Sequence, residues 1–218
     1  MKNFKLFLAA CLLGLATAAN AQFANSSAAS VSENNDAWDG IRVSYNLFAI
    51  EADDLLGDDL DKIGAFEVGY VKAFPISSTM PLFLETGASL LWASGDLYDK
   101  YDIKMSAELM SINIPVNLAY KFDIKEGMSI VPYAGLLLRY NISGEMELDM
   151  SAYGEGKVKM DMFDEDEGDG DRIQYGLQIG ARLDFNKFNV GVSYGFDMNE
   201  IMDDTKTNKI AFTVGFAL

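Results

Sequence analysis

The chain has 218 residues, 50% of them hydrophobic, and its 33 acidic against 17 basic side chains give a formal net charge of −16. This length suffices for one β-barrel or one ordinary domain, and so high a hydrophobic content argues against a disordered chain. The acidity argues against a nucleic-acid partner, because binding to phosphates requires a basic face.

Residues 1–21 are predicted to be a secretory signal peptide. MKNFK is a short basic stretch, LFLAACLLGLATA is an apolar run too short to span a membrane, and ANA before Gln22 has the small-x-small form that signal peptidase cleaves. LAAC, which ends at Cys11, also fits a lipoprotein cleavage box that would leave Cys11 lipidated, but few apolar residues precede it. We expect the later cut, which leaves a mature chain without cysteine and therefore without disulfides or thiolate metal sites.

Residues 22–37 are predicted to be a flexible lead-in, because they are rich in Ala, Ser and Asn and show no apolar periodicity. From Trp38 onward apolar and polar residues alternate with a period of two, which is typical of half-buried strands. Eight strands are predicted, at residues 38–50, 63–74, 81–92, 105–122, 128–141, 172–185, 188–196 and 209–218.

The connections between these strands alternate between long and short along the whole chain. An antiparallel barrel with its two ends in different compartments predicts this sorting, with short periplasmic turns and long outer loops. An even number of strands also lets the last strand pair with the first, which leaves no unpaired edge in lipid. The sequence therefore predicts an all-β fold over residues 38–218: an eight-stranded antiparallel transmembrane β-barrel, built as an up-and-down meander.

Each predicted strand has one bulky apolar face and one face of small or polar residues. Because a charged side chain on the lipid face costs up to about 2–4 kcal/mol at mid-bilayer, the ionic residues should point inward and pair with one another. The predicted lumen charge network comprises Arg42, Glu67, Glu85, Lys121, Arg139, Arg182 and Asp184. Since eight strands enclose a lumen just wide enough for side chains, we expect a filled core, with a narrow charged pore as the alternative.

Several residues interrupt this regular pattern. Pro115 and Pro132 lie inside predicted strands, where each removes a ladder hydrogen bond, so a bulge or a water-filled interruption is expected. Leu109 and Met110 break the alternation together, which suggests a bulge. Trp38 and the aromatic residues beside the short turns are expected in the periplasmic interfacial girdle.

The long connection after residue 141 contains two further alternating segments, EMELDM and KVKMDMF, on either side of SAYGEG. Gly154 and Gly156 permit a turn there, which predicts a hairpin above the membrane. Two more spanning strands, giving ten, are the alternative, but these segments are shorter than the ~9–11 residues needed to cross.

The same connection carries an acidic run, FDEDEGDGD. Asp164, Asp166, Asp169 and Asp171 could hold Ca²⁺ or Mg²⁺, although their spacing lacks the order of an EF-hand loop. A solvated charge run is the simpler interpretation, and a divalent ion bridging the loops to lipopolysaccharide phosphates is the sharper hypothesis. No other cofactor is expected.

Catalytic signatures are missing from the sequence. The chain contains no histidine, which removes the usual general base of serine hydrolases, and it has no Gly-rich phosphate loop, HExxH or CxxC motif. We therefore expect a protein that is not an enzyme.

The signal peptide, the eight alternating strands with sorted loops and the apolar final strand KIAFTVGFAL resemble outer-membrane β-barrel proteins of the OmpA-transmembrane and OmpX type, including the PorT-like "porin family". The resemblance covers residues 38–218 and is architectural. It implies export to the bacterial outer membrane, contact with lipopolysaccharide, a structural, adhesive or loop-mediated binding role, and reading of the last strand by the barrel-assembly machinery. Phe212 and Phe216 keep the outward register, but the chain ends on Leu218 where the family often has an aromatic residue.

A monomer is expected. The alternative class is a secreted soluble barrel of the lipocalin type, in which the bulky face would line a cavity for a hydrophobic ligand. Periodicity alone does not decide which face is inside.

Overall fold

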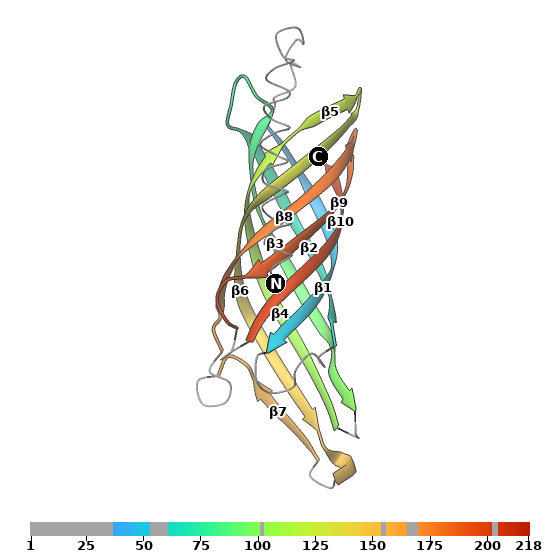
Figure 1. Cartoon of the computed structure of the whole chain (residues 1–218), viewed down its shortest axis with the longest axis vertical. Coiled ribbons are helices and arrows are strands. Elements are labelled where there is room, and N and C mark those ends of the chain that lie inside the picture. The colour runs from blue at the N-terminus through green and yellow to red at the C-terminus, as the bar shows by residue number, and fades with distance from the viewer. Residues whose placement is uncertain (1–36, 53–60, 101–102, 154–155, 165–169, 202–204) are drawn as a thin grey trace, which may run out of the picture. The chain divides into compact units, whose positions relative to one another are not determined.

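The computed structural model describes residues 37–52, 61–100, 103–153, 156–164, 170–201 and 205–218 (Figure 1). The predicted signal peptide, and the predicted lead-in apart from Ala37, lie outside the described residues. The described residues include no helix whose length and hydropathy would let it cross a membrane.

The strands are β1 (Trp38–Ala52), β2 (Ile63–Pro75), β3 (Leu82–Lys100), β4 (Ile103–Tyr120), β5 (Phe122–Lys125), β6 (Met128–Asp149), β7 (Lys157–Asp161), β8 (Ile173–Phe185), β9 (Phe188–Asp197) and β10 (Thr205–Ala217). A single 3₁₀ turn, η2 (Ser151–Tyr153), lies between β6 and β7.

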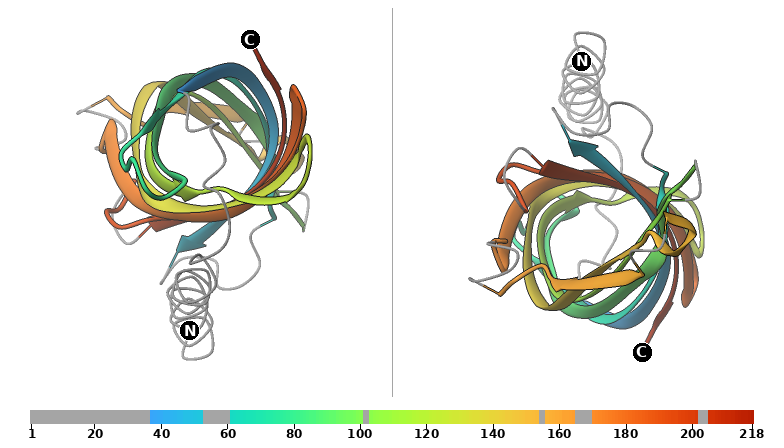
Figure 2. Two further views of the ribbon diagram at one scale, coloured as in Figure 1. Left: turned by 90° about the horizontal axis from the view of Figure 1, so that it is seen from above. Right: turned by 90° about the horizontal axis from the view of Figure 1, so that it is seen from below.

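Eight of these strands close into one antiparallel ring, in the order β1, β2, β3, β4, β6, β8, β9, β10. The ring closes where β1 pairs with β10, from Gly40↔Ala217 to Ala52↔Thr205. Figure 2 views the barrel from each of its two ends and shows the strands arranged in a closed ring. The predicted fold class, an eight-stranded up-and-down antiparallel barrel, is confirmed.

The structure decides which face of the strands is enclosed. Val190 and Val214 are 45% and 58% exposed, whereas Gln178 and Arg182 are 9% and 5% exposed. The same alternation covers the outer wall with large apolar side chains from every strand of the ring and directs the ionic ones inward. The bulky face is therefore outside, in contrast to the lipocalin-type alternative.

At the end with the long connections, three strands extend beyond the ring (Figure 1). β3 and β4 continue as a hairpin through most of the segment predicted as a long loop, up to the pair Lys100↔Ile103. β6 continues to Asp149 and pairs there with β7. Residues 95–100, 103–108, 145–149 and 157–161 thus form a four-stranded "projecting sheet". β7 has only five residues and is not part of the ring, so the hairpin prediction holds and the ten-strand alternative does not.

A register shift between β4 and β6 lies where the sequence pattern breaks. β4 pairs Met110 with Ser143 and its next residue with Asn141, so Ile142 is the extra residue. The predicted bulge exists, but it belongs to β6. β4 keeps its alternation, because Leu109 is buried and Met110 exposed. Leu109 looks out of phase in the sequence because a large apolar residue is expected on the lipid face. It points inward and packs among apolar residues inside the barrel.

Both prolines interrupt a ladder without shifting its register. β3 and β4 have no pair at Pro115 or at the residue before it, and Thr86 Oγ1 donates a 2.9 Å hydrogen bond to the Pro115 carbonyl. Pro132 falls between the last β4–β6 pair and the first β5–β6 pair, where β4 ends and β5 begins. The missing N–H groups therefore lie at gaps in the ladders.

Candidate functional site

The lumen near the short turns holds one ion cluster. Arg42 donates through its two terminal nitrogens to the two oxygens of Glu85, at 2.6 and 2.9 Å. Arg182 donates to the same carboxylate and, through Nε, to Asp184 at 2.9 Å. Both guanidinium groups lie over the Trp38 ring, 5.4 and 4.7 Å from its centroid. The buried carboxylate of Glu85 is thus neutralised by two arginines, and each arginine also makes a cation–π contact with Trp38.

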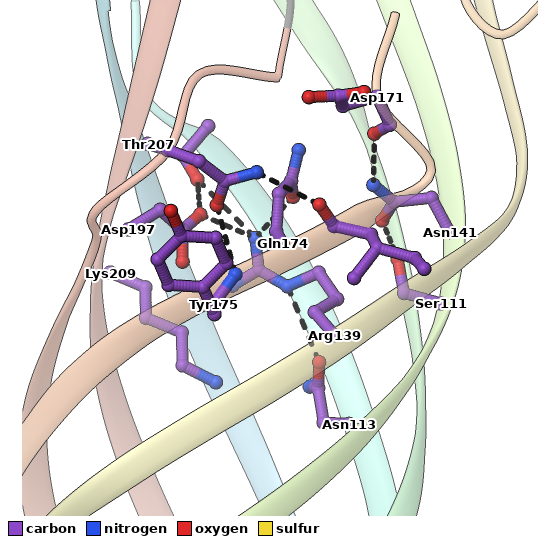
Figure 3. Close-up of polar contacts among 12 residues, drawn as sticks. Ser111, Asn113, Arg139, Asn141, Asp171, Gln174, Tyr175, Asp197, Thr207 and Lys209 are labelled. Carbon is purple, nitrogen blue, oxygen red and sulfur yellow. Dashed lines mark hydrogen bonds and ion pairs between the residues drawn. The ribbon is translucent and has the colours of Figure 1, made fainter.

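A second cluster surrounds Arg139 toward the long-connection end (Figure 3). Arg139 is 2% exposed and donates to Asp197 at 2.7 Å, to Gln174 at 3.1 Å, and to Thr207 and Asn113 at 3.3 Å. The Thr207 hydroxyl donates in turn to Asp197. These residues come from β4, β6, β8, β9 and β10, so the cluster ties together five strands of the ring.

A third group centres on Glu67 and contacts the Arg139 cluster through Asn113. Its carboxylate accepts hydrogen bonds from Asn46 at 3.2 Å, from Asn113 at 3.0 Å and from the Ser89 hydroxyl. Lys209 Nζ lies 3.5 Å from the same carboxylate and is 5% exposed. The interior charges are therefore paired and hydrogen-bonded, as burial away from water requires.

Between these groups lies a chamber, a cavity of about 80 Å³. Its lining includes the charged residues Arg42, Glu67 and Lys209 together with hydroxyl and amide side chains. The cavity also reaches Pro115, where the β3–β4 ladder is interrupted.

Two apolar clusters lie in the lumen on either side of the charges. The "outer plug", at the long-connection end, consists of Phe48, Ile63, Ala65, Leu91, Ala93, Leu97, Ala107, Leu109, Met162, Phe163 and Ile201. The "inner plug", near the short turns, consists of Ala73, Phe83, Ala119, Val131 and Tyr133, with Trp38 packed against it. Both plugs consist of buried side chains, and the ionic residues lie between them.

Part of the outer plug comes from connections and not from ring strands. Met162 follows β7 and its backbone N–H donates to the Gly144 carbonyl at 2.9 Å. A Cβ at Gly144 would stand 2.6 Å from the Phe163 ring, so only glycine leaves room for it. Arg172 lies over that ring at 5.2 Å. The chain after β7 thus folds back over the mouth of the barrel.

Six of the seven residues predicted for the lumen network lie inside the barrel, in the Glu85 cluster, the Arg139 cluster and the group around Glu67. Lys121 departs from the expectation, because it follows β4 at a short turn, is 28% exposed and pairs with Asp123 at 3.6 Å. Trp38 also differs, since it packs on the inner plug and beneath two arginines instead of joining the interfacial girdle.

The acidic run is described only in part. Asp164 and Asp171 are placed, and Asp171 donates its N–H to the Ile201 carbonyl, whereas Asp166 and Asp169 lie outside the described residues. Within the ranges that the structure describes, no group of three His, Cys, Asp or Glu side chains is arranged to hold a metal ion.

Sequence reasoning missed Lys209, Thr207 and Asp197, although the alternation carried the signal. Lys209 and Thr207 share the inward phase of Ala211 in the last strand, which begins earlier than predicted. Asp197 continues the inward phase of β9 one residue past the predicted strand end.

The closed ring, the apolar outer wall and the enclosed ions define an integral membrane β-barrel. The family model "Outer membrane protein beta-barrel domain" matches residues 7–217, and the chain belongs to this family. The protein is accordingly a bacterial outer-membrane protein, which excludes the secreted soluble alternative. Its short turns face the periplasm and its projecting sheet faces outward.

Several solved structures are similar at low sequence identity. Ail, the attachment invasion locus protein of Yersinia pestis, is 14% identical over 84% of this chain and 99% of its own, with a TM-score of 0.46. Neisserial surface protein A is 12% identical over 83% and 98%, with a TM-score of 0.43. The outer membrane enzyme PagL is 14% identical over 79% and 97%, with a TM-score of 0.44. No curated protein sequence gave a significant match.

Proposed function

We propose that this protein is a non-catalytic outer-membrane barrel that acts at the cell surface, by binding an adhesion partner through its projecting sheet. The observation that carries the proposal is the contrast between the two parts of the molecule. The lumen contains ion clusters and two apolar plugs, whereas three ring strands continue past the barrel and form the projecting sheet with β7.

The outer strand of the sheet offers backbone hydrogen-bonding groups. Among the described strands, β7 pairs with β6 only, so one of its edges is open. An extended segment of another protein can pair with such an edge through main-chain hydrogen bonds. The lysines of β7 limit unspecific pairing at the same edge, as is common for exposed strands.

The two faces of the β6–β7 hairpin differ in chemistry. On one face Lys157 lies 2.6 Å from Glu147 and 3.3 Å from Asp149, and Lys159 pairs with Glu145 and Glu147. The other face is apolar: Met146 packs against the outer plug, and Leu148, Val158 and Met160 share its face. Val158 is 53% exposed. Because the charges on the first face pair with one another, the open edge and the apolar face are the surfaces that remain for a partner.

The absence of histidine from the sequence supports a non-catalytic role, since it removes the commonest acid–base group. The two plugs favour the closed lumen and not the alternative of a narrow pore.

We also propose that the barrel is a monomer surrounded by lipopolysaccharide and that the barrel-assembly machinery reads β10. A closed ring leaves no lipid-exposed strand edge that a second copy would have to cover.

The test uses cells of a laboratory strain that display either the full chain or a variant in which residues 146–160 are replaced by a short Gly-Ser turn. We expect cells with the full chain to adhere to at least one immobilised matrix protein among collagen, laminin and fibronectin, and the hairpin variant to fall to the level of cells without the protein. Ile124→Ala, at a short turn, is the control and should adhere like the full chain. Equal adherence of the hairpin variant, or no adherence of the full chain, would contradict the proposal.

The same purified proteins test the closed lumen in planar bilayers. Discrete conductance steps from the full chain would favour the pore. Heat-modifiable migration in gels shows for every variant that the barrel is folded.

A further inference from the structure

The chamber in the middle of the lumen has room for a ligand. Its volume of about 80 Å³ exceeds the ~10–15 Å³ that one water requires. A few waters or one small ion with a partial water shell would fill it. Its lining reaches Tyr70 and Ala88, which are exposed on the outer wall, so the chamber is only partly enclosed.

Acceptors around the chamber are occupied. The Glu67 carboxylate already takes hydrogen bonds from Asn46, Ser89 and Asn113 and lies beside Lys209. A cation placed in the chamber would have to compete with these four donors.

Donors around the chamber are in excess. Arg42 uses both terminal nitrogens on Glu85, but its Nε is buried without a hydrogen-bond partner. The Lys209 ammonium group carries three N–H donors, and within the described residues its ion pair is with Glu67 at 3.5 Å. In Figure 3 the Lys209 side chain extends away from the Arg139 cluster. Ser44 and Thr213 share one 2.8 Å hydrogen bond, which uses the hydrogen of only one hydroxyl.

The charges that line the chamber also favour an anion, as the excess of hydrogen-bond donors does. The charged residues that line the chamber are two cations, Arg42 and Lys209, and one carboxylate, Glu67. Adding Glu85 and its second partner Arg182 leaves the excess positive charge unchanged. Asp184 pairs with Arg182 and completes the balance of the interior charges, but it does not line the chamber. The lining alone therefore carries one excess positive charge, which favours a bound anion.

We propose that the chamber is an anion site that holds one small monovalent ion of halide size. Lys209 Nζ and Arg42 Nε bind the ion from two sides, and a hydroxyl of the Ser44–Thr213 pair supplies a further donor. This assignment is independent of the role of the projecting sheet.

The direct test is a crystal of the refolded full-length barrel grown with bromide as its only halide. We expect one anomalous bromide peak inside the chamber, within hydrogen-bonding distance of Lys209 Nζ and Arg42 Nε. A chamber that contains only water, or bromide found only on the outer surface as an adventitious ion, would overturn the proposal.

A solution test compares folding stability in chloride and in gluconate at equal ionic strength, because gluconate is too large for the chamber. A ligand at ten times its dissociation constant raises the folding equilibrium constant about elevenfold. Chloride should therefore raise the midpoint of heat-modifiable migration for the unmodified chain. Lys209→Gln should abolish this shift, whereas Lys206→Gln, an exposed change on the same strand, should keep it. An equal shift for the unmodified chain and Lys209→Gln would contradict the assignment, and the bromide experiment stands even if Lys209→Gln does not fold.

Discussion

Glu85 shows most clearly what a single residue contributes to this barrel. Its side chain has no exposed surface and accepts hydrogen bonds from two arginines on different strands. In water each of these ion pairs would contribute little, but inside the barrel the loss of one partner leaves a charge that no solvent can screen. The carboxylate therefore decides whether β1, β3 and β8 can close around two guanidinium groups.

Glu85→Gln is expected to destabilise the barrel by about 3–5 kcal/mol, because two buried cations lose their shared counter-charge. Urea unfolding of the protein in lipid vesicles, followed by tryptophan fluorescence, measures this change. Glu126→Gln, the same substitution at an exposed turn position, should alter stability by less than about 0.5 kcal/mol. Equal stability of the two variants would show that the ion cluster is not needed for closure.

At the scale of an element, the β6–β7 hairpin is held by exposed ion pairs and by its turn. The hydrogen bond from Lys157 lowers the pKa of Glu147 below its ordinary value. Hydrogen bonds from the Ser151 side chain and backbone lower the pKa of Asp149. Both carboxylates therefore bind protons more weakly in the hairpin than in a free chain.

These pKa shifts fix the sign of the pH dependence. A carboxylate with a lowered pKa stabilises the hairpin fully above the pH at which the free group titrates, 4.5 for Glu147 and 3.8 for Asp149, and the stabilisation is lost as the pH falls through the lowered values. Amide hydrogen exchange, corrected for the intrinsic rate, should show weaker protection of Val158 and Met160 at about pH 3 than at neutral pH. Val190 and Val214 in the ring serve as controls and should stay protected. Unchanged protection of β7 at low pH would mean that its ion pairs do not hold it.

At the scale of the whole molecule, the charges are divided between an enclosed balanced set and an acidic remainder. Arg42, Arg139, Arg182 and Lys209 face the carboxylates Glu67, Glu85, Asp184 and Asp197 inside the barrel. These lumen ion pairs therefore add nothing to the formal charge of −16 that the whole chain carries. The wall between the two regions is apolar on its outer side, as a lipid environment requires.

The two tryptophans lie on opposite sides of the barrel wall, so their fluorescence can distinguish the lipid-facing side from the lumen. Trp92 is 60% exposed on the outer wall, whereas Trp38 packs on the inner plug. In vesicles with acyl-brominated lipids, we expect strong quenching of the variant Trp38→Phe, which retains Trp92. The variant Trp92→Phe, which retains Trp38, should be quenched little. Equal quenching of both variants would mean that Trp38 also faces lipid and that the assigned lumen is wrong.

The alternation of residues and the sorting of connections determined much of this protein in advance. Side chains in a strand point alternately to two faces, so the period-two pattern was enough to predict the eight ring strands and the inward direction of residues such as Arg139 and Arg182. It could also have supplied Lys209, which begins the predicted last strand, and Asp197, had the strand before it been drawn one residue longer.

Only the tertiary structure decided which face is inside, how far the strands extend beyond the ring, and which charges meet. Alternation is symmetric with respect to the two faces, and it does not mark where a strand leaves the membrane, as in β3 and β6. Pairing depends on register across strands that lie far apart in the sequence, so Arg42 and Glu85 meet only when the ring closes. For the same reason the sequence could not reveal beforehand that Trp38 lies beneath two arginines, or that Lys121 pairs with Asp123 at a short turn.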